Sequence, residues 1–417
     1  MRYLKSRAAP PSSSESSVAA EVAPLVARLR HRGWEAVEEL SRSLDHFEGP
    51  YRVPVEVLRR SADGLPPALR EALLTAEENV RAFCRHQRSL LADREWELSP
   101  GVRAGVRFLP VRRGAVYVPG GRYPLPSTAI MGVVPAQEAG VERVVALSPP
   151  RGAAGVDPVV LGTLGLLGVE EVWALGGVQG VGALALGLGP VERADLLVGP
   201  GNAWVTEAKR QFFGELGLDG LAGPSEVCIV ADATADPAAL AADLLAQSEH
   251  DPLAQGVLLA LDEGLGQKTL GEVQRLLDAL PTATVARSSW DRFGVVAVAT
   301  LEEAAAFANQ LAPEHLELAL ESPRSALGLF KNYGAAFLGH ASAEAFGDYV
   351  AGTNHILPTG GRARFSGGVW VGTFLRPLTH LELSPEAAER LAPPGEILAA
   401  AEGLSAHGAA LSARRKP

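Results

Sequence analysis

The chain has 417 residues, of which 47% are hydrophobic and 21% charged, so it can bury a large core, and its length predicts two to four domains. The formal net charge of −10 argues against nucleic acid as the main partner, because phosphate binding needs a clustered basic face that the sequence lacks. The longest apolar stretch, around 159–188, is interrupted by Glu170, Glu171 and many glycines, and so predicts no membrane span of roughly 18 residues.

Residues 1–20 are expected to be a flexible lead. They contain no apolar segment of the kind found in signal peptides, which predicts a cytoplasmic protein. The two cysteines, Cys84 and Cys228, lie within apolar helix-like and strand-like patterns and are interpreted as small buried residues rather than a disulfide. Neither cysteine lies beside an activating base, which disfavours aldehyde oxidation through a thiohemiacetal.

Residues 21–105 are predicted to form a helical region. Apolar residues recur at helical spacing from 18 to 47 and again from 66 to 91. We expect this region to pack on the domain that spans 227–376.

From residue 106 onward, short β-rich runs alternate with helical runs in two successive sets. Such alternation predicts right-handed βαβ units and parallel sheets, here in two α/β domains at 106–226 and 227–376. The first set has strands at 115–118, 143–147, 171–175 and 195–198, with helices near 125–139, 157–168, 179–187 and 203–215. The second set has strands at 226–230, 256–261, 294–298, 316–320 and 335–338, with helices at 237–250, 264–279, 301–311 and 323–331.

The segment 377–417 is predicted to be helical again, with helices at 384–391 and 395–404 separated by Pro393 and Pro394. It is too short to hold a core of its own. We therefore expect it to dock against another surface.

Residues with the chemistry of ligands and of acids or bases gather in the second half of the chain. Gln247 and His250 are one turn apart near the end of a predicted helix, so their side chains project about 60° apart and can reach one metal ion. Glu402 and His407 are five residues apart, about 140° around an ideal helix, which leaves open whether both reach one site. Further acids and imidazoles in apolar, Gly- and Pro-rich surroundings are Glu314, His315, Asp348 and His355.

A glycine-rich turn at 199–204, GPGNAW, follows a predicted strand and opens a helix, as dinucleotide-binding turns do. Trp204 stands where the third glycine of the GxGxxG pattern belongs. On the residues alone, an ordinary βα turn that needs glycine for its tight geometry is an equally good interpretation.

In order and context, these residues resemble the histidinol dehydrogenase family, which performs the last two oxidations of histidine biosynthesis. The likeness covers nearly the whole chain from about residue 25. Besides the segments above, it runs through YVPGG at 117–121, GGVQ at 176–179, GPGNAWVTEAKRQ at 199–211 and AGPSEV at 222–227. The resemblance implies an α/β fold of two Rossmann-like parallel-sheet domains, similar to aldehyde dehydrogenases, with a helical N-terminal region and a C-terminal helical arm.

The resemblance also implies the activity, an NAD-dependent, four-electron oxidation of L-histidinol through L-histidinaldehyde to L-histidine, with one zinc ion per subunit. By position, the NAD contacts would be Tyr117, Gln179 and Asn202, which all lie at the predicted C-terminal ends of strands of the first sheet, the edge where open α/β sheets bind ligands. Glu314 would activate water to hydrate the aldehyde. His315, with an ordinary pKa of about 6.5, would be the base in both oxidations.

The implied metal ligands are Gln247, His250, Asp348 and His407. Two imidazoles, a carboxylate and an amide oxygen suit zinc and tolerate cobalt or manganese. In the family, the metal takes the imidazole and amino nitrogens of histidinol, so it orients the substrate rather than activating water. Besides these ligands and the pair at 314–315, the implied substrate contacts are Ser225, His355 and Glu402.

Members of the family are intertwined homodimers in which the C-terminal arm completes the active site of the other subunit. A C-terminal segment that is too short to hold its own core and that carries an implied ligand, His407, is consistent with that arrangement.

Four other interpretations remain open: a general aldehyde dehydrogenase, a family paralogue that oxidises another amino alcohol or a sulfonate, a zinc hydrolase, and a non-catalytic binding module. The absence of a suitably placed cysteine disfavours the first, Glu402 argues against the second, and the many ionisable groups in apolar contexts disfavour the last.

Overall fold

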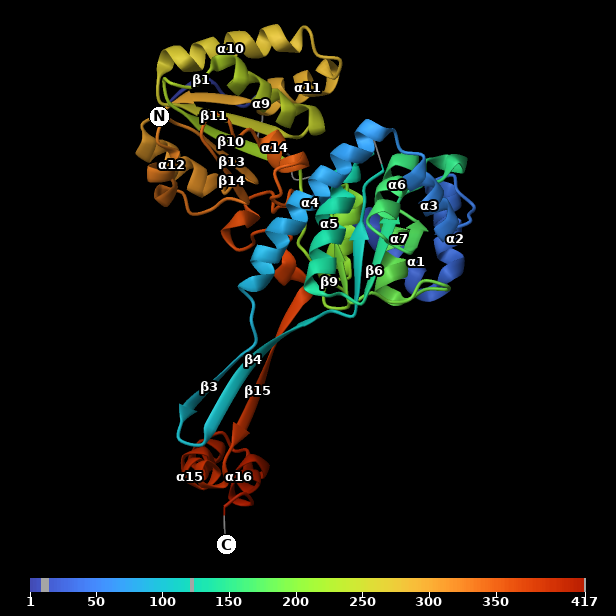
Figure 1. Cartoon of the computed structure of the whole chain (residues 1–417), viewed down its shortest axis with the longest axis vertical. Helices are drawn as coiled ribbons and strands as arrows, with labels where there is room; N and C mark the ends of the chain where they lie inside the picture. The colour runs from blue at the N-terminus through green and yellow to red at the C-terminus, as the bar shows by residue number, and fades with distance from the viewer. Residues whose placement is uncertain (9–14, 121–123, 416–417) are drawn as a thin grey trace.

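A computed structural model describes residues 1–8, 15–120 and 124–415. Two α/β domains lie side by side and form the body, and a long β-stalk leaves this body and carries two helices at its far end (Figure 1). Gly121, the last residue of the YVPGG segment, lies outside the described residues.

The first domain is built on a six-stranded sheet with the order β2-β7-β6-β5-β8-β9, parallel except for β2. Alternate strand residues enter two cores: Val116 packs with α5 and α6 on one face, and Ala115 packs with α7 and α8 on the other. The strands are β2 (Arg52–Val53), β5 (Arg113–Tyr117), β6 (Arg143–Ser148), β7 (Glu171–Ala174), β8 (Leu196–Val198) and β9 (Gly217–Leu218). The helices are α5 (Pro126–Ala139), α6 (Pro158–Leu166), α7 (Gly177–Leu186) and α8 (Ala203–Gln211).

The N-terminal helices cover this first sheet, so the expectation that residues 21–105 pack on the second domain is wrong. Helix α1 lies on α7 and α8, α2 on α7, α3 on α6, and α4 on α5. Glycines permit this close packing: a Cβ on Gly182 of α7 would come within 2.6 Å of Leu29, and one on Gly165 of α6 within 2.5 Å of the Leu58 carbonyl. The helices are α1 (Glu15–Arg32), α2 (Trp34–Leu44), α3 (Val55–Asp63) and α4 (Pro67–Ser89).

The second domain has a six-stranded sheet with the order β1-β12-β11-β10-β13-β14, parallel except for β1. Helices α9, α10 and α11 cover one face, and α12 with the segment after β13 covers the other. The strands are β1 (Arg2–Lys5), β10 (Glu226–Ala231), β11 (Gln255–Ala260), β12 (Val295–Val298), β13 (His315–Ala319) and β14 (Ala335–Leu338). The helices are α9 (Pro237–His250), α10 (Glu263–Leu277), α11 (Ala283–Phe293), α12 (Leu301–Leu311), α13 (Pro323–Ala326) and α14 (Glu344–Tyr349).

The start of the chain departs from the expected flexible lead. Arg2–Lys5 form β1, which pairs antiparallel with β12 and closes one edge of the second sheet. The free α-amino group of Met1 forms an ion pair with Glu303. Residues 9–14 of the expected lead lie outside the described residues.

The stalk is a three-stranded antiparallel sheet in which β4 (Val102–Pro110) lies between β3 (Arg94–Ser99) and β15 (Leu375–Leu383). Residues 94–105 and 377–383 were expected to belong to helical regions, and that expectation is wrong. Helix α15 (Pro385–Ala401) continues through Pro393 and Pro394, where a break was expected, and packs against α16 (Ser405–Ser412). Short 3-10 turns lie at Gly152–Ala154, Leu327–Leu329, Arg362–Arg364 and Val371–Phe374.

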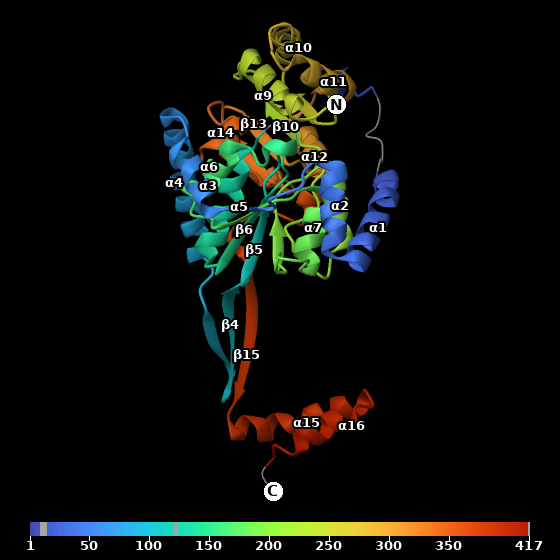
Figure 2. The same ribbon diagram turned by 90° about the vertical axis from the view of Figure 1, so that its right-hand side faces the viewer.

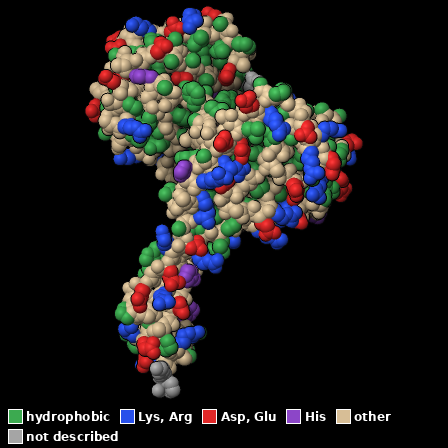
Figure 3. Space-filling model, viewed as in Figure 1, with side chains coloured by type: hydrophobic (Ala, Val, Ile, Leu, Met, Phe, Trp, Pro, Cys, Tyr) green, Lys and Arg blue, Asp and Glu red, His purple; other side chains and the backbone are tan. Residues whose placement is uncertain are grey.

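The views in Figures 1 and 2 both place α15 and α16 at the end of the stalk, away from the two sheets. Acidic and basic side chains are interspersed over the face seen in Figure 3. Within the described ranges, no helix combines the length and the apolar character that crossing a membrane requires.

Candidate active site

The two domains enclose a cavity of about 710 Å³. One wall is formed by residues that follow the strands of the first sheet, including Pro200. The other wall comes from Ser225 and Glu314, which precede β10 and β13 of the second sheet, and from His355. The carboxyl edge of one parallel sheet therefore faces the amino edge of the other across this cavity.

Glu314 lies at this amino edge, directly before β13. Its Oε2 accepts hydrogen bonds from the Ser225 hydroxyl at 2.7 Å and from the Glu226 backbone N–H at 3.2 Å. Burial raises its pKa to about 8, and the nearby Asp348 and Glu226 carboxylates act in the same direction. Glu314 is thus a carboxyl group that can exchange a proton near neutral pH.

His315 is the first residue of β13, so the pair at 314–315 lies where the chain enters a strand. Neighbouring strand residues point to opposite faces, and the His315 ring accordingly turns toward α9 and α14. Its Nδ1 lies 3.3 Å from Gln247 Oε1 and 3.2 Å from Glu344 Oε1, while Nε2 has no hydrogen-bond partner among the described residues. Burial, with the His250 and His355 rings nearby, lowers its pKa to about 3, so the ring is neutral.

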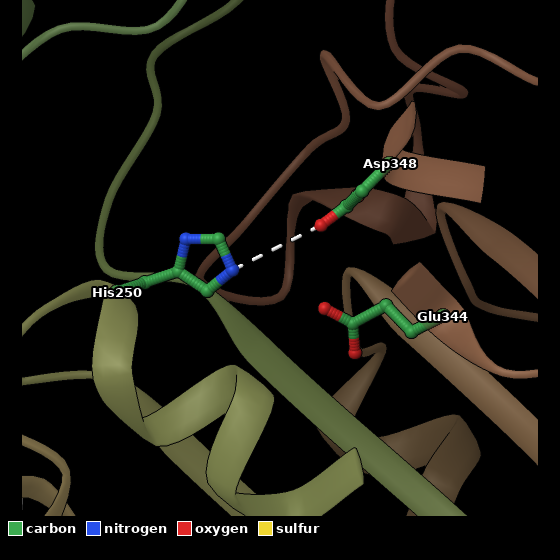
Figure 4. A group of neighbouring side chains, drawn as sticks. All are labelled: His250, Glu344 and Asp348. Carbon is green, nitrogen blue, oxygen red and sulfur yellow. Dashed lines mark ion pairs between the residues drawn. The ribbon is translucent and has the colours of Figure 1, made fainter. Parts of the chain in front are cut away.

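Helices α9 and α14 bring together a set of groups that can bind a cation. One ligand atom from each of His250, Glu344 and Asp348 lies within 4.8 Å of those of the other two, and Figure 4 shows the three side chains converging. His250 Nε2 is 3.9 Å from Asp348 Oδ2. Gln247, one turn before His250 on α9, is fully buried, and its Nε2 has no partner among the described residues.

Burial raises the pKa of Asp348 to about 6, while the nearby His250 ring acts in the opposite direction. Burial and several carboxylates, Asp348 first among them, raise the pKa of Glu344 well above its ordinary value. Buried acids in this state gain most from a positive charge placed among them. The donor set of imidazole nitrogen and carboxylate oxygens, with an amide next to it, therefore fits a borderline divalent ion.

His355 follows α14 and is held by two hydrogen bonds. Its Nδ1 donates to the Asp348 backbone carbonyl at 2.9 Å, so its Nε2 is free to accept a hydrogen bond from the Thr128 hydroxyl at 3.3 Å. Burial lowers its pKa to about 4. Thr128 belongs to α5, so this contact joins the two domains at the cavity.

Tyr117, Gln179 and Asn202 all lie at the carboxyl edge of the first sheet, as expected. The Tyr117 hydroxyl accepts from the Gly177 N–H at 3.2 Å, and Gln179 donates to Asp45 at 2.7 Å. Asn202 is the N-cap of α8 and accepts from the backbone N–H groups of Trp204 and Val205.

The glycine-rich turn before α8 is tightly held. Gly199 has φ 114°, and a Cβ there would come within 2.2 Å of the Tyr117 carbonyl oxygen, so only glycine fits. Buried Lys209 donates to the Gly199 carbonyl at 2.9 Å and to Asp219 at 2.6 Å, and Asp219 in turn accepts from the Gly199 N–H at 2.7 Å. This lysine, which belongs to the GPGNAWVTEAKRQ segment, and this aspartate, which lies outside the quoted segments, fix the turn that carries Asn202.

Glu402 and His407 are not brought to this site within one chain. Both are exposed; Glu402 is the C-cap of α15, and His407 lies in α16 at the end of the stalk (Figure 1). The ten other implied site residues lie in the body, at or near the facing edges of the two sheets.

Three further residues whose side chains touch the implied site residues were not predicted from the sequence: Asp45, Thr128 and Glu344. Asp45 and Thr128 lie far along the chain from their partners, and no pattern links them. Glu344 stands four residues before Asp348, and this helical spacing was the available signal.

Comparison with known proteins gives a consistent result. The family model for histidinol dehydrogenase matches residues 9–415. The chain is 44% identical to the histidinol dehydrogenase of Zymomonas mobilis over 406 residues, covering 96% of this chain and 94% of that protein. It is 45% identical to that of Thermus thermophilus over 390 residues, covering 93% and 92%. The crystal structure of histidinol dehydrogenase from Elizabethkingia anophelis superposes with a TM-score of 0.91 at 32% identity, covering 99% of this chain and 98% of that one.

Proposed function

This chain belongs to the histidinol dehydrogenase family of oxidoreductases, and on that premise we propose that it oxidises L-histidinol through L-histidinaldehyde to L-histidine, with NAD as the oxidant. The observation that carries this proposal is the buried pair Glu314 and His315. One is a carboxyl group whose pKa is raised to about 8, and the other is a neutral imidazole whose Nε2 has no partner among the described residues. Two successive oxidations of one carbon need two such groups.

Gln247, His250 and Asp348 would hold the metal ion, which we propose to be zinc. The fit rests on the convergence of the His250 and Asp348 ligand atoms and on the buried, partly unpaired amide of Gln247. When bound, the cation supplies a positive charge that can hold the imidazole and amino nitrogens of the substrate. The same positive charge would offset the crowding of buried carboxyl groups around it.

In the first oxidation, His315 Nε2 accepts the proton of the substrate hydroxyl as the carbon loses a hydride. As water adds to the aldehyde, Glu314 accepts a proton from the water and His315 returns its proton to the aldehyde oxygen, so the imidazole is neutral again. Glu314 then releases its proton to solvent. In the second oxidation, His315 accepts a proton from the hydrated aldehyde as the carbon loses its second hydride. NAD supplies the oxidising power by accepting one hydride in each oxidation. Positioned bases of this kind contribute roughly 10²–10⁴ in rate.

Tyr117, Gln179 and Asn202 are the residues we propose for NAD binding. Their support is their position at the carboxyl edge of a parallel sheet, beside a glycine turn that opens α8. Trp204 in place of the third glycine is consistent with a binding mode that departs from the usual dinucleotide fingerprint.

We propose further that the protein acts as a homodimer in which Glu402 and His407 of each arm complete the site of the other subunit. The arm supports this, because α15 packs on α16 and on β15 of the stalk, and Ile397, Leu398 and Leu404 of the arm are exposed. His407 would be the fourth metal ligand, and Glu402, with Ser225 and His355, would contact the substrate.

We propose that the protein is cytoplasmic. Its two cysteines are free thiols, which is consistent with that location.

The test is to incubate the zinc-loaded protein with L-histidinol and NAD and to follow NADH absorbance. We expect NADH to form with L-histidinol at a higher kcat/KM than with other amino alcohols or with hydroxysulfonates. Preference for one of those substrates would identify a paralogue. Metal-dependent hydrolysis without NADH would identify a hydrolase.

A further inference from the structure

We propose that Glu344 is a positioning residue for His315, and that it holds the proton of the imidazole on Nδ1 so that the Nε2 lone pair is available to the substrate. The inference rests on the proposed function, since it assigns His315 as the base of that reaction. Glu344 carries no role in the motifs discussed above.

The geometry around the ring supports this role. Two acceptor oxygens, Gln247 Oε1 at 3.3 Å and Glu344 Oε1 at 3.2 Å, lie near Nδ1 of His315. A ring nitrogen that faces two oxygen acceptors carries the hydrogen, so the other nitrogen, Nε2, keeps its lone pair. Nε2 is buried and has no partner among the residues of the described ranges, as a base awaiting a substrate would be.

The two acceptors are not equivalent. Gln247 is a proposed metal ligand, and an amide oxygen that binds a cation is no longer available to accept the Nδ1–H of His315. Glu344 Oε1 then remains as the nearest side-chain acceptor at 3.2 Å, since Glu314 Oε2 lies 3.9 Å from Nδ1. Without Glu344, the buried ring would lose this partner and keep only its backbone hydrogen bond with Glu226, and the proton could move to Nε2, where it would block the base. Because either protonation state of a carboxyl group offers an acceptor oxygen, this role does not depend on how Glu344 titrates.

Glu344 is itself held in place. Its backbone N–H donates to Glu317 Oε1 at 2.7 Å, and Glu317 lies two residues beyond His315 on β13, on the same face of the strand. Glu317 also forms a side-chain hydrogen bond with Asp243 of α9. Glu344 is only 3% exposed, so its carboxyl group has little freedom to turn away from His315.

The competing role for Glu344 is that of a metal ligand, because its carboxylate also lies near His250 and Asp348 (Figure 4). The two roles predict different outcomes when Glu344 is replaced. A metal ligand affects zinc content and substrate binding whatever residue stands at 315. A positioning residue affects only the step in which His315 accepts a proton.

The experiment compares Glu344→Ala and Glu344→Gln with the unchanged protein and with Asp243→Asn, a half-buried control that lies in the same acidic cluster and makes no contact with His315. We expect Glu344→Ala to lower kcat about 100-fold while KM for L-histidinol and bound zinc change less than about threefold. The amide oxygen of Glu344→Gln can still accept from Nδ1, so it should recover about tenfold of that loss. Asp243→Asn should stay within about threefold of the unchanged protein.

A double-mutant cycle then tests whether the effect passes through the imidazole. In a His315→Asn background, Glu344→Ala should change kcat by less than about twofold. Loss of zinc, additive effects in the cycle, or an unchanged kcat in Glu344→Ala would each overturn the inference. If the unchanged protein forms no NADH from L-histidinol, the proposed function fails instead, and the cycle is not reached.

Discussion

The Ser225 hydroxyl donates a hydrogen bond of 2.7 Å to Glu314, so the residue before β10 and the residue before β13 are joined at the edge of the second sheet that faces the cavity. This bond favours the anionic form of a carboxyl group whose pKa burial has otherwise raised. Glu314 is therefore poised to alternate between acid and base, which is what hydration of an aldehyde requires.

Replacement of Glu314 by glutamine should separate the two oxidations. The amide of the Glu314→Gln protein cannot take a proton from water, so hydration of the aldehyde should slow by about 100-fold or more, while His315 still serves the first oxidation. We expect the ratio of NADH to consumed L-histidinol to fall toward one, with aldehyde captured by a carbonyl reagent. An unchanged ratio at an unchanged rate would remove Glu314 from the hydration step.

The raised pKa of Glu314 also predicts how metal-free protein responds to pH. In the unfolded chain this group loses its proton near pH 4.5, but in the folded chain it keeps the proton up to about pH 8. The unfolded state therefore binds fewer protons between these values, and the contribution of Glu314 to stability is lost as pH rises through this window. Glu314→Gln, which does not titrate, should show a smaller fall in Tm from pH 5 to pH 8 in the presence of a chelator. An identical fall in both proteins would contradict the raised pKa of Glu314 in the folded state.

Removal of the metal should abolish turnover without unfolding the protein. The proposed ligands come from α9 and α14, which are parts of an already large core rather than a small domain organised by the metal. We expect chelated protein to keep its circular dichroism spectrum, to produce no NADH, and to regain activity with zinc. Full activity in protein shown by elemental analysis to be free of metal would eliminate the ligand assignment.

The separation of His407 from the body predicts complementation between two inactive variants. His315→Asn damages the body of a subunit, and His407→Asn damages its arm, so each protein alone should be nearly inactive. After random subunit exchange, half of the dimers are hybrids with one intact site each, and about a quarter of the unchanged activity should return. If exchange is verified by mass and no activity returns, each site is built from one chain and the shared-site model is wrong.

The two sheets could be predicted from the sequence because their strands are short apolar runs between helices, as in Glu226–Ala231. The stalk was not predicted, although Val102, Ala104, Val106 and Phe108 of β4 alternate with polar residues or glycine. Its partner β15 is mostly exposed and pairs with β4 from more than 250 residues along the chain, so no local pattern links the two strands. Pro393 and Pro394 predicted a break because proline removes a backbone donor, yet α15 continues through both.

The site residues, too, include some that could be predicted from the sequence and some that could not. The Gln247 and His250 pair was predictable because helical periodicity alone places both on one side of α9. The neighbours of the site residues were not, because Asp45 meets Gln179, and Thr128 meets His355, across more than a hundred residues of sequence. Such contacts depend on how the domains pack, which a single sequence does not encode in any local pattern.

The most direct measurement of the central claim is the number of NADH molecules formed for each L-histidinol consumed, with excess NAD and bound zinc. Because Glu314 and His315 are adjacent at the start of β13, with His315 Nδ1 3.9 Å from Glu314 Oε2, both oxidations should finish before the intermediate leaves. We predict about two NADH per L-histidinol, L-histidine as the product, and no aldehyde in solution. A ratio near one with accumulating L-histidinaldehyde would contradict the four-electron reaction and leave an ordinary alcohol dehydrogenase.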